Sequence, residues 1–504
     1  MVRYNVPGTY DITLMTTNMD EDTIYTTSEI VVDECDIPDS IASNHDNHWI
    51  MGYQYGSGHG LGGFDFTFPD SVVAARYLSP VELNNGSVIM SDVNGNLQFY
   101  SNGISIMNMD NKPIKGSECF NSELNDYSLD YFIGNQSLLS LPAVNQDSVY
   151  LLFDCDPSQF SVYWSGASNL SMTIIDMSKN AGKGEVLSCN EVLIDNMLLN
   201  STMQATRHQN GIDWWIIVGK YESEEYYKIL ISENGVESVE TAKWERYYGS
   251  TFSGQSTFSP DGNYFAQVIR EDQEVVMWKF DNQTGDLYDQ RIYTIVTLDE
   301  IEFPQGCSFS PDSHFLYVSS RSQMRQIDLC NYDEIDAEHI ASWDGSYEFI
   351  YPLIFGKQML TPNQQIVVTP TGNSHKSFGV IESPNEKGVN CNFSQHSLNI
   401  SEEARNIADV IPVFPHYRNY PSYEGECETV NINEVDASTF YVYPNPIGDG
   451  SILHFSQSMT GSLYDVSGRK IYSFRNTDYL DVNSLTSGIY FIKNEVGMQR
   501  FIKQ

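Results

Sequence analysis

Apolar and polar residues alternate with a period of two over most of this chain, a pattern typical of β-strands with one buried face. The alternating segments are short, and they are bounded by Gly, Pro, Asn and Asp, the residues that tight turns require. Helix periodicity is scarce, and its best short candidate is 401–408. Groups of strands recur at spacings of about 50 to 60 residues, at 87–108, 148–154, 213–232, 264–280, 315–329 and 365–382.

A short phrase, Phe-Ser-Pro-Asp, occurs twice within this pattern. It ends at Pro260-Asp261 and, 51 positions later, at Pro311-Asp312, and an apolar strand stands on each side of both copies. Proline presets the turn backbone and Asp bonds its own backbone, so we expect all four residues to form tight turns. A period of about 50 residues fits the four-stranded blade of a β-propeller. We predict an all-β propeller of seven blades, with six as the alternative, and both turns inside a blade.

The N-terminal strands, after Pro7-Gly8 and from Thr23 to Val32, cannot bury a sandwich core alone. We therefore expect the chain to begin within a domain, which would explain why no signal-peptide pattern opens it. A second small β-sandwich is expected at the other end, where short strands are joined by Ser-Gly turns. The expected parts are a partial β-sandwich at 1–34, a linker at 35–46, the propeller at 47–420, a linker at 421–439 and the C-terminal sandwich at 440–504.

The charge balance narrows the range of partners. The chain has 27 Lys and Arg against 67 Asp and Glu, a formal net charge of −40. Nucleic acid and anionic membrane surfaces would be repelled by such a field, so neither is expected as a partner. No apolar run reaches 18 residues, so we predict no transmembrane segment.

The eight cysteines form no C-x-x-C pair, which disfavours zinc-ribbon and thioredoxin-like sites. An even number in a β protein permits disulfides in an oxidising compartment. If Cys307 and Cys330 end the first and third strands of one blade, they lie about 9–10 Å apart, beyond disulfide reach. Two pairs remain open, Cys155 with Cys189 and Cys391 with Cys427.

Catalytic signatures are missing from the sequence: it contains no G-x-S-x-G, no H-E-x-x-H and no EF-hand loop. Residues 92–96 and 281–286 carry oxygen ligands at spacings that could hold structural calcium, but both stand where a hairpin must turn. His59, in the glycine run 56–63, and His208 have no identified partner. Acid pairs for glycoside hydrolysis cannot be singled out among 67 carboxylates. We predict no catalytic, cofactor-binding or metal-binding residue.

Several longer phrases stand in a fixed order along the middle of the chain. They are Trp49–Phe66, Asp92–Asn108, Gly211–Val218, the two Ser-Pro-Asp turns, Phe378–Asn385 and Ile411–Arg418. This series resembles a family of secreted bacterial propeller proteins related in shape to WD-repeat and YVTN propellers, and it covers residues 47–420. The sequence departs from that family at Asn121–Asp130, in the connection between the first two blades. The phrase from Pro7 to Leu14 resembles the immunoglobulin-like PKD domain first described in polycystin.

Three phrases close the chain. They contain Tyr443, Pro444, Asn445 and Pro446, then Gly468 and Arg469, and finally Gly488 and Tyr490. In this order at the C-terminus they resemble the sorting domain of the bacterial type IX secretion system. The resemblance implies a partnership with that secretion machinery, and a protein that is secreted or held on the outer-membrane surface of a gram-negative bacterium.

The sequence indicates the function of the protein less specifically than its fold. The favoured interpretation is a secreted or cell-surface binding or adhesion protein with an unknown extracellular protein or glycan ligand. The alternative is an extracellular polysaccharide hydrolase or lyase with its site in the propeller channel. A third interpretation is a structural spacer or adhesin stalk.

Overall fold

In the computed structural model the chain forms two compact units, Met1–Glu424 and Gly425–Gln504. The residues that it describes are 8–17, 23–32, 43–52, 61–67, 72–77, 79–83, 86–121, 136–155, 166–199, 201–248, 253–295, 303–332, 337–348, 350–371, 375–400, 410–418, 440, 442–448, 452–466, 468–494 and 498–504.

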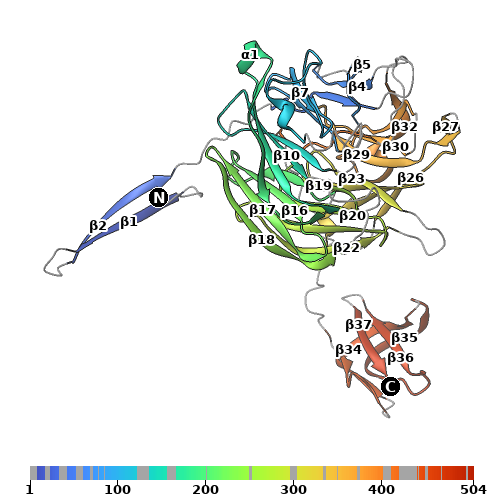
Figure 1. Ribbon diagram of the computed structural model, residues 1–504. Helices are drawn as coiled ribbons and strands as arrows, with labels where there is room; N and C mark the ends of the chain where they lie inside the picture. The colour runs from blue at the N-terminus through green and yellow to red at the C-terminus, as the bar shows by residue number, and fades with distance from the viewer. Residues whose placement is uncertain are drawn as a thin grey trace. The chain divides into compact units, whose positions relative to one another are not determined.

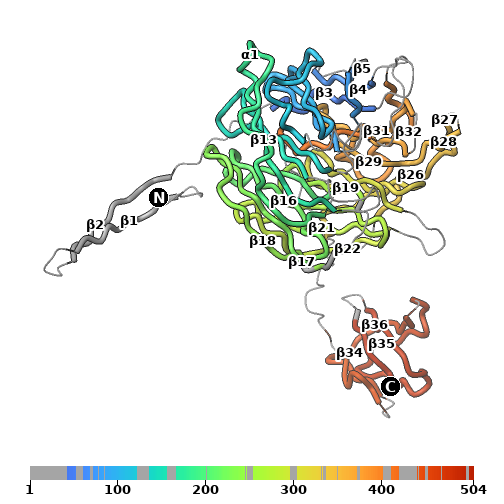
Figure 2. Tube along the Cα trace, in the orientation of Figure 1, coloured from blue at the N-terminus to red at the C-terminus, as the bar shows by residue number. Residues whose placement is uncertain are grey.

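Seven antiparallel sheets follow one another in chain order through the first unit (Figures 1 and 2). The first two have three strands each: β3 (His48–Met51), β4 (Leu61–Asp65) and β5 (Val73–Tyr77), then β6 (Val88–Ser91), β7 (Leu97–Ser101) and β8 (Ile106–Asn108). The third holds β9 (Leu138–Pro142), β10 (Val149–Cys155), β12 (Leu170–Asp176) and β13 (Glu185–Ile194). The fourth holds β15 (Gln204–Arg207), β16 (Trp214–Gly219), β17 (Ser223–Ser232) and β18 (Gly235–Tyr248).

The last three sheets repeat the same four-stranded order. The fifth holds β19 (Ser253–Phe258), β20 (Tyr264–Ile269), β21 (Glu274–Asp281) and β22 (Asp286–Thr294). The sixth holds β23 (Pro304–Phe309), β24 (Phe315–Ser320), β25 (Gln323–Asp328) and β26 (Glu338–Ser342). The seventh holds β29 (Phe355–Leu360), β30 (Ile366–Pro370), β31 (Ser377–Ile381) and β32 (Phe393–Asn399).

Short elements complete this unit. Two-stranded ladders join β1 (Gly8–Thr17) to β2 (Thr23–Val32), β11 (Gly166–Ala167) to β14 (Leu198–Leu199), and β27 (Tyr347–Glu348) to β28 (Tyr351–Pro352). The helical turns are α1 (Lys179–Gly182), η1 (Ser117–Cys119), η3 (Leu329–Asn331) and η4 (Gly388–Cys391). The PKD-like assignment of 1–34 stays a prediction, and the helical candidate at 401–408 lies outside the described residues.

Burial explains why these strands form. Every residue of β23, β24 and β29 is buried, as expected for inner strands covered on both faces by neighbouring sheets. The first strands of successive sheets pack side by side, β19 on β23 and β23 on β29. The outer strand β13 is instead half-exposed along most of its length. This arrangement is that of a β-propeller, so the predicted fold class is confirmed. The number of blades and the domain boundaries stay predictions.

The two ends of the propeller segment meet. In Figure 1 the first sheet (blue) lies beside the seventh (orange), and the rings of Phe64 and Phe378 are 5.3 Å apart. The segment 410–418, which follows the last sheet, packs on the first sheet through Phe414, whose ring lies 6.2 Å from Trp49. A closing blade shared between the chain ends would require this contact.

Arg418 clamps the two ends together. Its guanidinium donates hydrogen bonds to Asn44 Oδ1 at 2.6 Å, Asp46 Oδ1 at 2.7 Å and Asn47 Oδ1 at 2.5 Å. Asp46 is only 4% exposed. Burial raises its pKa, and the charge of Arg418 opposes that shift. Because a buried carboxylate is costly without a partner, the clamp depends on both charges being present.

Buried polar side chains link the inner strands of the propeller to one another. Gln136 donates to the carbonyl of Ser256 at 2.9 Å and accepts from its backbone N–H at 2.8 Å, and the Ser256 hydroxyl donates to the Ser201 carbonyl. Gln255 Oε1 accepts from the backbone N–H of Gln358 at 3.0 Å. All five residues are at most 6% exposed. Inner strands that are far apart in sequence are therefore joined through amide and hydroxyl groups.

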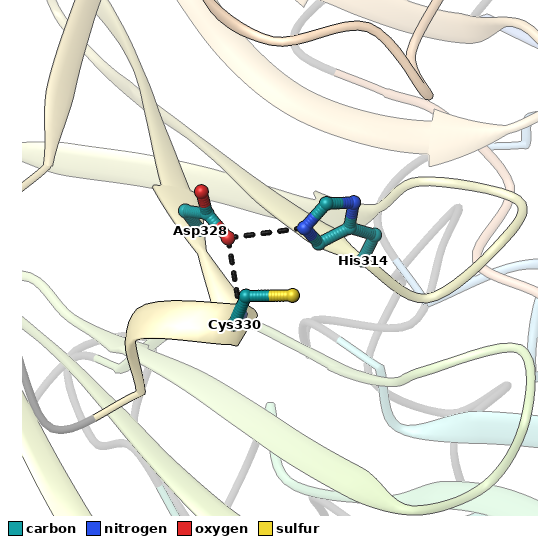
Figure 3. Close-up of side chains that lie close together, drawn as sticks. All are labelled: His314, Asp328 and Cys330. Carbon is teal, nitrogen blue, oxygen red and sulfur yellow. Dashed lines mark hydrogen bonds and ion pairs between the residues drawn. The ribbon is translucent and has the colours of Figure 1, made fainter. Parts of the chain in front are cut away.

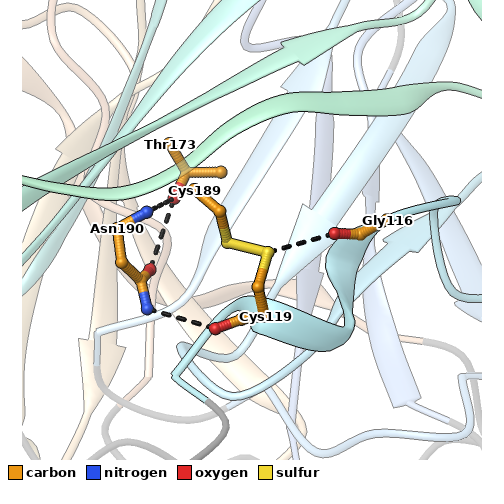
Figure 4. Close-up of a disulfide and its surroundings, with 5 residues drawn as sticks. All are labelled: Gly116, Cys119, Thr173, Cys189 and Asn190. Atoms are coloured by element: carbon orange, nitrogen blue, oxygen red, sulfur yellow. Dashed lines mark hydrogen bonds between the residues drawn. A yellow bond between two sulfur atoms is a disulfide. The ribbon is translucent and has the colours of Figure 1, made fainter.

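One disulfide corrects the sequence-based pairing. Cys119 is bonded to Cys189, which ties η1 to the outer strand β13 of the third sheet (Figure 4). Cys155 is buried and not disulfide-bonded, and its sulfur lies 4.0 Å from that of Met203. Because Cys189 is bonded to Cys119, the proposed Cys155–Cys189 pair is wrong. Cys155 is the last residue of β10 and is buried in the hydrophobic core, whereas Cys189 lies on the outer strand β13.

Of the two other cysteine predictions, one is wrong and one is confirmed. Cys391 is also free and buried, so the proposed Cys391–Cys427 pair is wrong as well. Its sulfur is enclosed in the apolar cluster that contains Tyr317 and Phe355. The exclusion of a Cys307–Cys330 pair is confirmed, because Cys307 is a free, buried thiol.

The second unit contains one five-stranded sheet. Its strands are β33 (Val442–Tyr443), β34 (Ile452–Asp465), β35 (Lys470–Asp481), β36 (Gly488–Lys493) and β37 (Met498–Lys503). The long strand β34 pairs with β33, β35 and β36, and β37 extends the sheet beyond β36. A core of apolar residues that includes Phe440, Leu463, Ile492 and Phe501 is fully buried against it.

Candidate functional site

A pocket of about 380 Å³ opens where the fifth, sixth and seventh sheets come together. We call it the rim pocket, and it is lined by Arg270, Phe303, Gln305, Arg321, Ile354 and Thr371.

Strand direction places these residues at one end of the propeller. The Ser-Pro-Asp turns join the first strand of a sheet to its second, at 259–263 and 310–314. Arg270, Arg321 and Thr371 directly follow the second strands β20, β24 and β30, so they stand at the opposite strand ends. The other three lining residues stand at the beginnings of β23 and β29, at that same end.

Backbone hydrogen bonds hold these positions. The Arg321 carbonyl accepts from the N–H of Phe355 at 3.1 Å, and the Ile354 carbonyl accepts from the N–H of Thr371 at 2.8 Å. Gln305, only 7% exposed, donates from Nε2 to the carbonyl of Phe303 at 3.1 Å. The rim pocket is therefore built on strand ends and their immediate connections, which gives it a rigid wall.

The two arginines are the electrostatic feature of the rim pocket. Arg270 is half-buried, Arg321 is exposed, and neither forms an ion pair with any carboxylate among the residues that the structure describes. The cation at the equivalent strand position of the fourth sheet, Lys220, is instead paired with Glu225 at 2.7 Å. Arg246 bonds two carboxylates. In a chain of net charge −40, the described residues of the rim pocket bring two positive charges together without a paired carboxylate among them.

The lining can bind, orient and partly desolvate a ligand. The guanidinium groups donate hydrogen bonds to anionic oxygens, Thr371 offers a hydroxyl, and Phe303 and Ile354 supply apolar surface. None of the six lining side chains is an acid, a histidine or a thiol.

Sequence reasoning missed this pocket although a signal was present. Arg270 and Arg321 are separated by 51 positions, the spacing of the Ser-Pro-Asp phrase, and each follows the Asp of its phrase by nine residues. Aligning the two copies of the phrase would have placed both cations at one position of the repeat.

The residues of the repeated phrase lie in equivalent turns. Asp261 Oδ1 accepts from the Ser259 hydroxyl at 2.5 Å and from the N–H of Asn263 at 3.0 Å. Asp312 Oδ1 accepts from Ser310 at 2.6 Å and from the N–H of His314 at 3.1 Å. Pro260 and Pro311 precede these aspartates in the two turns.

The next turn position is strained and also links the sheets. Gly262 and Ser313 occupy it with φ of 71° and 63°, a conformation natural for glycine and uncommon for serine. The Ser313 hydroxyl accepts a hydrogen bond from the Asp261 N–H at 3.0 Å, so the two turns touch. The carboxylates therefore organise their own turns.

The oxygen-rich turns considered for calcium use their carboxylates internally. Asp92 Oδ1 accepts from the N–H groups of Asn94 and Asn96, both at 2.9 Å. Asp281 Oδ1 accepts from the N–H of Gln283 at 2.9 Å, and Asp286 is paired with Lys228 at 2.8 Å. These contacts are those of hairpin turns, and the absence of a cofactor stays a prediction.

The two histidines singled out from the sequence are not brought together. His59 lies outside the described residues. His208, 8% exposed, accepts at Nδ1 from the N–H of Asn210 at 3.1 Å, and its ring packs 5.9 Å from that of Trp215. His208 thus orders the turn before β16.

A cluster of His314, Asp328 and Cys330 has ligand atoms within 4.8 Å of one another (Figure 3). Asp328 accepts from Cys330 N at 3.0 Å, bonds His314 Nε2 at 3.1 Å and pairs with Lys387 at 2.9 Å. Burial opposes its charged form, yet the Lys387 and backbone hydrogen bonds hold the pKa of Asp328 below its ordinary value. Cys330 is disulfide-bonded, so its sulfur is no thiolate ligand. The cluster caps η3 and ties it to the seventh sheet.

The C-terminal phrases occupy strand ends and turns of the second unit. Asn445 donates from Nδ2 to the Arg500 carbonyl at 2.9 Å and accepts from the Ile502 N–H at 3.0 Å, which attaches its loop to β37. The Tyr490 hydroxyl donates to the Thr486 carbonyl at 2.8 Å. Tyr443 is half-exposed, Pro444 and Pro446 flank Asn445, and Gly488 begins β36.

The middle phrase forms a turn beside a second pocket. Gly468 has φ of 78°, and Asp465 accepts from the N–H and Nε of Arg469 at 3.0 and 3.1 Å. A pocket of about 340 Å³ lies next to it, lined by Tyr464, Asp465, Val466, Gly468, Phe491 and Lys493.

Comparison with known proteins identifies this second unit. Residues 441–504 match the family model described as the secretion system C-terminal sorting domain. The chain therefore carries a type IX sorting domain, which marks it as a secreted or cell-surface protein that interacts with the secretion machinery. No curated protein matches the chain. No helix in the described part of the chain is long and apolar enough to cross a membrane.

Solved structures similar to this chain are distant in sequence. A protein from Lactobacillus plantarum is 13% identical with a TM-score of 0.40, over 72% of this chain and 98% of its own. A periplasmic gluconolactonase from Pseudomonas aeruginosa is 12% identical with a TM-score of 0.33, over 90% and 99%. The β-propeller domain of Cps50 (Swd1) from Myceliophteria thermophila is 11% identical with a TM-score of 0.30, over 73% and 95%.

Proposed function

We propose that this chain is a binding protein of the cell surface or extracellular medium, exported across the outer membrane of a gram-negative bacterium by the type IX secretion system. The sorting domain at 441–504 carries the export part of this proposal. The ligand is an extracellular molecule that the propeller holds at its rim pocket.

Binding at the rim is favoured over catalysis in the channel by how polar groups are distributed. Around the inner strands, the buried Gln136 bonds Ser256, and the buried Gln255 bonds Gln358. The rim pocket offers donors and apolar surface, and its volume falls within the roughly 300–1,000 Å³ that ligand sites have.

Deleting residues 441–504 tests export. The full chain and the deletion variant would be expressed in a bacterium with type IX secretion, and both cell-surface and medium fractions would be measured. We expect the deletion variant to remain inside the cell. Asn445→Ala, which removes two hydrogen bonds to β37, should reduce export, whereas Asn483→Ala on an exposed turn should not. Export of the deletion variant at the level of the full chain would refute the sorting role.

Incubation of the purified chain with a panel of extracellular glycans separates binding from turnover. Retention of a glycan without release of product supports a binding protein. Release of shortened or unsaturated sugars would instead establish the hydrolase or lyase alternative. If neither a glycan nor an extracellular protein is retained, the spacer role is left as the explanation of the propeller.

A further inference from the structure

The geometry of the rim pocket points to the class of its ligand. We propose that it binds a short saccharide bearing a carboxylate group, with Arg270 and Arg321 holding the carboxylate. This inference rests on the proposed binding function at the same pocket and goes further by naming what is bound.

Two arginines that form no ion pair within the described part of the chain line one pocket. Acids outnumber bases by 67 to 27, and partners were available for other cations: Lys220 has Glu225, and the buried Arg418 has Asp46. No carboxylate pairs with Arg270 or Arg321 in the described part of the chain. Like charges that share a pocket repel one another, so a bound anion stabilises this arrangement.

A carboxylate on a sugar ring matches the hydrogen-bonding geometry of arginine. The planar guanidinium presents parallel N–H donors that match the two oxygens of a carboxylate, and such bidentate bonds are among the strongest polar contacts in proteins. Two guanidinium groups from neighbouring sheets can approach the same carboxylate from different sides.

The remaining lining residues favour a saccharide as the carrier of that carboxylate. Phe303 and Ile354 offer apolar surface for the C–H face of a sugar ring, and Thr371 and Gln305 are neutral groups that bond hydroxyls. The net charge of −40 repels a long polyanion, so recognition is expected to be local and the ligand short.

Titration calorimetry of the full chain with digalacturonate, and with the neutral galactose disaccharide as its uncharged counterpart, tests the proposal. We expect digalacturonate to bind at least tenfold more tightly than the neutral disaccharide. Arg270→Ala and Arg321→Ala should each weaken binding of the acid about tenfold or more, because each removes charge-assisted hydrogen bonds. Arg321→Lys keeps the charge but loses the planar fork, so it should recover only part of that loss.

Matched variants show whether the effect belongs to the pocket. Lys220→Ala removes a cation at the same strand position of the fourth sheet, outside the pocket, and should leave the affinity within about twofold. Thr371→Arg adds a third guanidinium at the equivalent position of the seventh sheet and should tighten binding of the acid. Circular dichroism and melting of each variant check that the fold is retained.

Each of the other outcomes would overturn a defined part of the proposal. Equal affinity for both disaccharides, unaffected by Arg270→Ala, would sink the carboxylate inference and leave the proposed binding function standing. Tighter binding of poly-L-glutamate than of digalacturonate would overturn the saccharide. No binding of digalacturonate by the unaltered chain would overturn the inference altogether. The glycan panel would then decide the proposed function independently.

Discussion

The propeller should lose stability in mild acid in part through His416, a half-buried histidine. His416 lies in the segment 410–418 and hydrogen-bonds through Nε2 to the carbonyl of Phe258 at 3.0 Å. Burial lowers its pKa from 6.5 to about 4, and the bond to Phe258 opposes that shift. The folded chain therefore keeps this imidazole neutral at a pH where the unfolded chain protonates it.

The sign and size of the effect follow from linkage. Between pH 6.5 and 4 the unfolded state binds more protons than the folded state, so the free energy of unfolding falls as the pH falls. At ~1.36 kcal/mol per pKa unit, the full shift corresponds to about 3 kcal/mol, reached below pH 4. Lowering the pH from 7.5 to 5.0 should remove about 2 kcal/mol of this contribution.

Denaturant unfolding followed by tryptophan fluorescence at pH 7.5 and 5.0 measures the effect. His416→Gln retains an N–H donor for Phe258 and does not titrate, so it should lose about 2 kcal/mol less than the unaltered chain over this range. Carboxylates, and the buried His45 whose pKa is also lowered by burial, contribute equally to both proteins and cancel. His339→Gln, at an exposed imidazole, is the control and should behave like the unaltered chain. If His416→Gln and the unaltered chain lose the same stability, the burial argument is wrong.

Two further stability changes follow from the long-range contacts of the propeller. Arg418→Ala leaves Asp46 buried without its counter-charge and should cost about 3 kcal/mol in denaturant unfolding at pH 7.5. Its control is Lys115→Ala, at an exposed ion pair, which should change stability by less than about 0.5 kcal/mol. Similar losses in both variants would contradict the clamp. Replacing Cys119 and Cys189 together by serine opens a cross-link over a sequence separation of 70 residues and should cost up to about 4 kcal/mol. An unchanged unfolding midpoint would show that this bond does not hold the third sheet.

Sequence patterns determined the features that depend on neighbours along the chain. Alternation specifies a strand because successive side chains point to opposite faces, and this holds at the start of β34, where exposed and buried residues alternate from Ile452 to Phe455. The Ser-Pro-Asp turns close through Asp261 and Asp312, whose partners lie two residues away. The sorting domain was recognisable because its three phrases form a compact local series. Fold class and export could therefore be predicted before any tertiary contact was known.

Only the tertiary structure decided which distant residues meet. Three contacts join residues many tens of positions apart: the disulfide of Cys119 with Cys189, the ion pair of Arg418 with Asp46, and the hydrogen bond of His416 to the carbonyl of Phe258. The order of strands along the chain does not specify how far each sheet is rotated relative to the next. That rotation determines which distant residues come into contact. The rim pocket has the same origin: Arg270 and Arg321 occupy one position of a local repeat, but they line a single cavity only because neighbouring sheets bring the ends of β20 and β24 together.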